Sequence, residues 1–324
     1  QTLNVASGSP TVALQIGSST VNATYASGAG TANLLFTYTI QAGQTDANGI
    51  AIGANALSLN GSTLQDPRAN TTTLLAPGTA DNSSFTVDTT APFLSITSNV
   101  GQLKSGETAN ITFTFSEDPG NTFVWDGTTG DITLSNGTLS AISGTGTTRT
   151  AVFTPTPSLN TGTASIAVSS GTYQDAAGNN GSASGTPSLT IDTLAPTIST
   201  VALSGSTGIL NTYLNENDTA NVSVTFTEAV NLNLTGGSPT LALLVGSSTV
   251  QATYVSGAGS NTLVFTTTIA AGQNDADGIA IALNALSLNG AVLLDAAGNS
   301  ASTSFAAVNS NSVYMVDTLA PSVS

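Results

Sequence analysis

The chain contains an internal repeat, and this repeat limits the possible folds more than any other feature. When Gly8 is aligned with Gly237, the two regions match without a gap as far as Asp88 and Asp317, and about half of the aligned residues are identical. A different unit lies between the two copies. The sequence therefore predicts a tandem array of separate units rather than one large core.

Each unit ends in the same motif, Asp-Thr-x-Ala-Pro, at residues 88–92, 192–196 and 317–321. These motifs predict a first unit over 1–92, a second over 93–196, a third over 197–319, and the start of a following repeat at 320–324. The third unit contains an apolar segment at 222–226 that precedes the part it shares with the first unit. We therefore expect the first unit to lack its N-terminal strands, either because the chain is a piece of a longer array or because strands from another chain complete it.

The local pattern predicts β-structure throughout. Residues 20–25, 111–115 and 263–269 alternate apolar side chains with Thr, Ser or Asn, and they are rich in β-branched and aromatic residues. Gly, Asn, Ser and Asp cluster between such segments, and no stretch has a helical period. The predicted fold is all-β, with antiparallel β-sandwiches of the immunoglobulin type in a row.

The composition excludes several classes of function. The chain has 3 Lys and Arg against 18 Asp and Glu, a net charge of −15, and neither His nor Cys. Nucleic acid is therefore not an expected partner, and imidazole or thiolate chemistry is impossible. No apolar run is long enough to insert into a membrane. Paired carboxylates recur at each joint instead of gathering in one cleft, so we expect no enzyme.

Most acidic residues occupy repeated positions. In a sandwich with alternating strand directions, the loop after the second strand and the loop before the last strand lie at the end where the chain enters. This topology places one Glu, one Asp and one Asn beside the Asp of each incoming linker. The two predicted sets are Asp88, Glu117, Asp175 and Asn179, and Asp192, Glu228, Asp295 and Asn299.

Three carboxylates and an amide that converge on one joint repel each other unless a cation lies among them. An all-oxygen set of this kind favours Ca²⁺ over Zn²⁺ or Cu²⁺. The alternative is that each linker is only a turn, and that Asp-Ala-Ala-Gly-Asn is only a tight loop in which Asp and Asn accept backbone hydrogen bonds.

Further candidate calcium ligands do not belong to these two sets. Asp275 and Asp277, with Asp46 at the equivalent place in the first unit, alternate as in a calcium loop but lack a distal Glu, so a plain turn is an equal alternative. Asp66 belongs to the joint set of the first unit, where the Glu and linker are missing. Trp125 is expected in a sandwich core rather than on a binding surface.

The motifs together resemble the bacterial immunoglobulin-like repeats of large secreted adhesins and biofilm-associated proteins. They are the Asp-Thr-x-Ala-Pro joints, Phe-Ser-Glu and Phe-Thr-Glu at strand ends, and the Asp-Ala-Ala-Gly-Asn loops. The resemblance implies an extracellular, calcium-stiffened stalk at the cell surface, which supports adhesion or biofilm formation through domains outside this segment. Its partners would be neighbouring repeats and a host or environmental surface. The alternative is a subunit of an extracellular filament, sheath or surface layer that self-assembles by strand exchange through the first unit.

Overall fold

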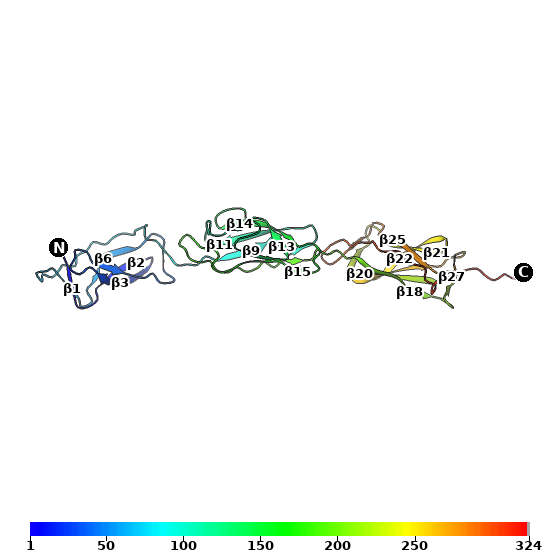
Figure 1. Cartoon of the computed structure of the whole chain (residues 1–324), viewed down its shortest axis with the longest axis horizontal. Helices are drawn as coiled ribbons and strands as arrows, with labels where there is room; N and C mark the ends of the chain where they lie inside the picture. Colours follow the sequence, from blue (N-terminus) through cyan, green and yellow to red (C-terminus); the bar gives the residue numbers. More distant parts are fainter. Residues whose placement is uncertain (323–324) are drawn as a thin grey trace.

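A computed structural model describes residues 1–322 and shows an elongated molecule, with three groups of strands in a row and the two termini at opposite ends (Figure 1). Every regular element in this range is a β-strand. The prediction of tandem immunoglobulin-like β-sandwiches in an extended array is thereby confirmed. No helix among these residues is long and apolar enough to cross a membrane.

The strands of the first unit form three small sheets, with orders β4-β3-β2-β6, β1-β7 and β5-β8. Its strands are β1 (Asn4–Ala6), β2 (Thr11–Ile16), β3 (Ser19–Ser27), β4 (Leu35–Thr37), β5 (Thr45–Asp46), β6 (Ala51–Ser58), β7 (Thr63–Gln65) and β8 (Val87–Asp88). In the third unit, the positions of β2, β3, β4 and β6 belong to a larger sheet, and this difference is taken up below.

The second unit packs three sheets, with orders β13-β14-β11-β9, β10-β17-β15 and β12-β16. Its strands are β9 (Leu94–Ser98), β10 (Gln102–Leu103), β11 (Ala109–Phe115), β12 (Ile132–Ser135), β13 (Gly137–Leu139), β14 (Thr148–Pro155), β15 (Gly162–Thr163), β16 (Ser165–Val168) and β17 (Thr190–Ile191). Alternate residues of β11 are buried, and Phe113 and Phe115 contact Phe123 and Tyr173 in an aromatic cluster. The period-two pattern thus forms the core.

The third unit has one long sheet, β18-β20-β23-β22-β21-β25, with β26 also paired to β20, and a small sheet, β19-β27-β24. Its strands are β18 (Ile198–Thr207), β19 (Tyr213–Leu214), β20 (Thr219–Asn233), β21 (Thr240–Val245), β22 (Ser248–Ser256), β23 (Ser260–Thr268), β24 (Asn274–Asp275), β25 (Ala280–Ser287), β26 (Val292–Leu294) and β27 (Met315–Asp317). The inward side chains of β20 lie at the centre of its core.

Strand pairing is antiparallel except at one place in each of the last two units. There β10 pairs in parallel with β17, and β19 pairs in parallel with β27. The sequence did not predict these parallel pairs. They tie an early strand of each unit to its last strand, directly before the linker, and so position the Asp of the linker.

The predicted boundaries near residues 92 and 196 fall in linkers without strands, and no sheet within residues 1–322 joins strands from two units. For the predicted following repeat at 320–324, the last two residues lie outside the described range. The division of the chain into these units stays a prediction.

Candidate metal centres at the joints

The linker motif anchors the chain to the unit that it leaves. The hydroxyl of Thr89 donates to the carbonyl of Gln44 at 3.0 Å and accepts from the Gly43 N–H at 2.9 Å. Thr193 and Thr318 make the corresponding pair of bonds within the second and third units. Because both hydrogen bonds reach back into the preceding unit, the Thr of the motif fixes the direction in which the linker departs.

The Pro at the end of the motif anchors the chain to the unit that it enters. The carbonyl of Pro92 accepts from the Ser182 N–H at 2.9 Å and from the Tyr173 hydroxyl at 3.3 Å. Pro196 accepts from the Ser302 N–H at 2.8 Å. The linker is therefore held at both ends, and the Asp at its start lies against the next unit.

The first joint brings together Asp88, Glu117 and Asp175, whose carboxylate oxygens lie within 4.8 Å of one another. Asp88 ends β8 of the first unit, and Glu117 follows β11 of the second. Asp175 is held in a tight loop, where one carboxylate oxygen accepts from the Ala177 and Asn179 N–H groups, each at 2.9 Å. The site is thus shared between two units.

The second joint repeats this arrangement with Asp192, Glu228 and Asp295, again within 4.8 Å. Asp295 is 4% exposed and accepts from the N–H groups of Gly298 at 2.6 Å and Asn299 at 2.8 Å. Glu228 lies where β20 leaves its ladder with β23, between the pairs at Thr225 and Val230. This irregularity turns the strand end toward the joint.

The two Asn side chains position the carboxylates. The Asn299 amide nitrogen donates to Asp295 Oδ2 at 2.7 Å and to the carbonyl of Asp192 at 3.0 Å. Asn179 makes the same bonds to Asp175 at 2.8 Å and to the carbonyl of Asp88 at 3.1 Å. One amide thus locks the loop of one unit to the linker from another. Both residues were predicted in the metal sets, and the structure gives them this supporting position.

The glutamates experience an environment that disfavours their charge. Burial raises the pKa of Glu228, and the carboxylates of Asp192 and Asp295 raise it further. Burial and the charges of Asp88 and Asp175 raise the pKa of Glu117 in the same way. Within the described chain, Glu228 Oε1 is a buried oxygen without a hydrogen-bond partner. Such an atom requires a cation or a donor to offset its lost hydration.

The residues at both joints fit a hard divalent cation. Carboxylate oxygens from three side chains converge at each joint, and the sequence offers no His or Cys as a softer ligand. Ca²⁺ takes oxygen ligands and tolerates irregular geometry, whereas Zn²⁺ and Cu²⁺ favour nitrogen and sulfur. The donor chemistry and the unpartnered oxygen of Glu228 therefore point to the same kind of ion.

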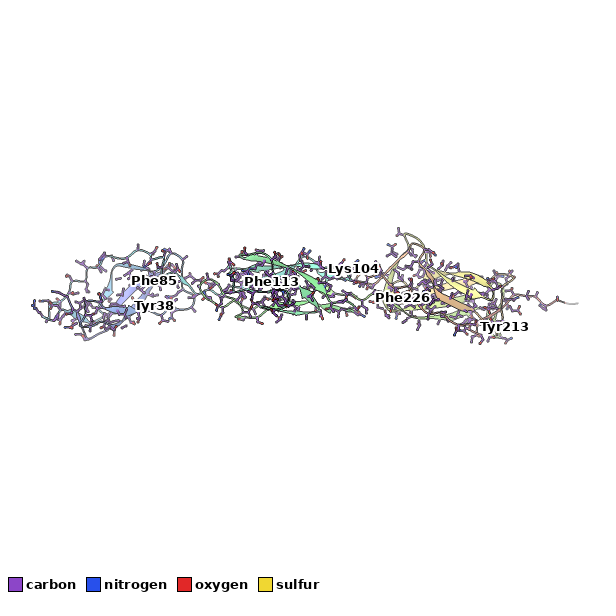
Figure 2. The ribbon with its side chains drawn as sticks, turned by 45° about the horizontal axis from the view of Figure 1, so that its top comes forward. Tyr38, Phe85, Lys104, Phe113, Tyr213 and Phe226 are labelled. Atoms are coloured by element: carbon purple, nitrogen blue, oxygen red, sulfur yellow. The ribbon has the colours of Figure 1, made fainter. Side chains whose placement is uncertain are left out.

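The second joint has further contacts that sequence reasoning missed. Lys104 lies between the second and third units (Figure 2), and its Nζ donates to the carbonyl of Gly298 at 3.3 Å. The N–H of Ser105 donates to Asn299 Oδ1 at 2.9 Å. No sequence signal marks these contacts, because they depend on how two units meet.

At the first joint, a cavity of about 570 Å³ opens beside Asp88, Glu117 and Ala177.

The Asp residues in the strand-flanked turns lie outside both triads. Asp46 accepts from the N–H groups of Gly17 and Gly49, each at 2.8 Å. Asp275 makes the equivalent bonds to Gly246 and Gly278, also at 2.8 Å. Both carboxylates are 4% exposed and already stabilised by backbone donors. The geometry thus favours the plain-turn alternative at these positions.

Asp277 also has a partner of its own. It accepts from the Ser310 hydroxyl at 2.9 Å. In the first unit, Asn48 takes the position of Asp277 and Asp81 takes the position of Ser310. There the Asn48 amide donates to the Asp81 carboxylate, so the acceptor is on the opposite residue of the pair. A side-chain hydrogen bond thus closes the same loop in both copies, which gives these polar residues a structural role.

Asp66 retains the loop geometry of the joint residues without their surroundings. Its carboxylate accepts from the N–H groups of Arg68 at 2.8 Å and Asn70 at 2.9 Å, and from the Asn70 amide at 2.8 Å. Within residues 1–322 it belongs to none of the carboxylate triads.

Trp125 is partly buried against the core of the second unit.

Replacing Asn299 by Ala should destabilise the third unit. The substitution removes bonds to Asp295, Asp192 and Ser105 at a site that is 4% exposed. Loss of a buried hydrogen-bonding partner costs about 1–3 kcal/mol. Thermal unfolding should show a lower melting temperature for the third unit. Asn70→Ala, in the exposed loop of the first unit, should leave the melting temperature of the third unit unchanged. An equal decrease of that melting temperature in both variants would contradict the role assigned to Asn299.

Comparison with known proteins agrees with this architecture. Residues 88–191 match the family model of the bacterial Ig-like domain. The matched segment begins at Asp88 and contains all three carboxylates of the first joint. The sequence matched none of the proteins with curated descriptions. Residues 88–191, the second unit together with the linker that enters it, therefore form a bacterial Ig-like domain.

Proposed function

We propose that this chain is an extender segment of a bacterial surface adhesin, a stalk of Ig-like units whose joints are stiffened by Ca²⁺. The observation that carries the proposal is the carboxylate triad that recurs at both joints, with ligands drawn from the linker and from the unit that follows. A cluster that served one domain alone would not need the Asp of the linker.

Bound Ca²⁺ would neutralise three carboxylates that otherwise repel each other. Asp88 and Asp192 contribute from the linkers, whereas Glu117, Asp175, Glu228 and Asp295 contribute from the units that follow. Because the ligands come from both sides, their common attachment restricts rotation at the joint. Asn179 and Asn299 hold the loops in place for this purpose.

In this function the chain lies outside the cell. Calcium sites of extracellular modules bind with dissociation constants of about 10⁻⁴–10⁻³ M, and such sites fill where calcium is millimolar. The role is mechanical and non-enzymatic: the units carry a ligand-binding region away from the cell, and adhesion or biofilm formation occurs through that region. The strongly acidic composition, with a net charge of −15, opposes nonspecific association between neighbouring units through charge repulsion.

Small-angle X-ray scattering with calcium and then with excess chelator tests this function, at two protein concentrations. We expect a longer and narrower particle with calcium, and a broader distribution of lengths in chelator. Asp192→Asn combined with Asp88→Asn should abolish the difference. A profile that calcium leaves unchanged would refute the stalk proposal, whereas growth with protein concentration would favour the filament subunit.

The two joints should differ in their dependence on calcium. Lys104 and Ser105 tie the second joint in a way that is independent of any ion, whereas a cavity borders the first joint. In chelator, the distance distribution between spin labels on either side should broaden more at the first joint. Lys104→Met should bring the second joint closer to the behaviour of the first. Equal broadening at both joints in the original chain would contradict this reading.

A further inference from the structure

The first unit exposes apolar side chains that its near-copy, the third unit, buries. Phe36 occupies the position of Phe265, and Ile40 occupies the position of Ile269. Phe265 and Ile269 are 0% and 1% exposed, whereas Ile40 is 38% exposed. Phe85, at the position of Tyr314, is 61% exposed. Phe36 and Ile40 are therefore half-buried and exposed, respectively, although their counterparts in the third unit are fully buried.

The open side chains line a continuous groove of about 540 Å³. Its walls come from β2, β3, β4 and β6 and from the segment before β8, and all of its lining residues are uncharged. Tyr38 and Phe85 lie together in the first unit in Figure 2. The groove residues used below are Val12, Leu14, Phe36, Tyr38, Ile52 and Phe85.

The third unit shows what covers this face. There β20 pairs antiparallel with β23, with Val222 opposite Phe265 and Val224 opposite Leu263. Val222 and Val224 are 0% exposed and pack in one cluster with Leu241, Leu243 and Ile281. In the first unit, β4 takes the place of β23. In the described part of the chain its only paired neighbour is β3.

The length of β4 reflects this missing neighbour. It pairs with β3 in the same register as β23 pairs with β22, with Tyr25 opposite Phe36 as Tyr254 is opposite Phe265. However, β4 has 3 residues, whereas β23 has 9. The inner ladder is therefore complete, and the outer edge is an open template for another strand.

We infer that the first unit binds an added β-strand of the β20 type along β4. The occupant is an extended, uncharged segment from outside residues 1–88, with Val or Phe at alternate positions and Thr, Ser or Asn between them. Its apolar side chains fill the groove beside Phe36, and its backbone extends the sheet in the antiparallel register that β20 takes on β23. This inference does not rest on the calcium proposal.

A second copy of the chain is a poorer donor. Its own β20 already forms the centre of the core of the third unit, where Val222, Val224 and Phe226 are at most 1% exposed. Removing that strand would expose the cluster that it covers. The complementary strand must therefore come from a segment that is not already folded into a unit.

A labelled peptide of residues 219–227, which contains the inward face of β20 and no charged residue, tests the inference on the full chain. Fluorescence anisotropy should show saturable binding with one peptide per chain. Hydrogen exchange should show new protection at residues 33–40. The same peptide with Val222→Asp and Val224→Asp should bind at least about tenfold more weakly, because its charges would enter an apolar groove.

Two chain variants locate the groove. Phe36→Ala should weaken binding several-fold, whereas Leu75→Ala, at a side chain that is 82% exposed in the same unit, should have no effect. Absence of binding, equal binding of the two peptides, or protection in the third unit instead of at residues 33–40 would each overturn the inference. Sedimentation without peptide gives a further check: a dimer with residues 33–40 protected would identify a second copy as the occupant and overturn it as well.

Discussion

Glu228→Gln should abolish the calcium-dependent stabilisation of the third unit and leave that of the second unit intact. With a dissociation constant of about 10⁻⁴–10⁻³ M, calcium at about 10 mM stabilises a unit by about 1.4–2.7 kcal/mol. For a domain of this size the melting temperature rises by roughly 5–11 °C. Differential scanning calorimetry with calcium and with chelator measures both transitions in one chain.

The same variant should have the opposite effect in chelator. Burial and the charges of Asp192 and Asp295 raise the pKa of Glu228, so its ionised form is unfavourable without a cation. A neutral Gln removes this repulsion and should raise the melting temperature of the third unit when calcium is absent. Glu216→Gln is a matched control, because Glu216 is an exposed residue just before β20 in the same unit. If calcium still stabilises the third unit of Glu228→Gln, this joint does not bind the ion through Glu228.

Phe113→Ala should unfold the second unit at a much lower temperature while the third unit retains its own transition. Phe113 is 0% exposed and contacts Phe123 at the centre of the aromatic cluster. Truncation of a buried Phe costs about 3–5 kcal/mol, and each kcal/mol lowers the melting temperature by about 4–8 °C. Calorimetry should therefore show one transition displaced and the others in place.

Val152→Ala provides the control for this second prediction. Val152 belongs to β14 of the same unit, but it is 40% exposed and points away from the core. Its replacement should shift the transition by only a small amount. A simultaneous shift of all transitions in Phe113→Ala would show that the units share their stability, contrary to the separate cores around Phe113 and Phe226.

The fold class was predictable because strand patterns are local. The alternation at residues 109–115 places Ile111, Phe113 and Phe115 on one face, and the structure buries all three in β11. A period of two needs no knowledge of distant residues. The repeat and the linker motifs are likewise visible in the sequence alone, and the matched family segment begins at one of these motifs.

Strand topology, and not local sequence pattern, predicted which residues meet at each joint. Alternating strand directions place Glu228 and the loop of Asp295 at the same end of their unit, and the structure puts both beside Asp192. The role of each carboxylate was harder to predict from the sequence. Asp275 and Asp295 look alike in sequence, but Asp275 accepts from the Gly246 and Gly278 N–H groups and belongs to neither carboxylate triad.

The sequence by itself thus determined the β-class, the tandem organisation and the residues that can meet at each joint, because these depend on periodicity, self-similarity and strand direction. Only the tertiary structure decided that Lys104 reaches Gly298, that β10 and β19 pair in parallel, and that Phe36 borders an open groove. These features join residues far apart in the chain. Their distances depend on how whole sheets and units pack, which no local pattern encodes.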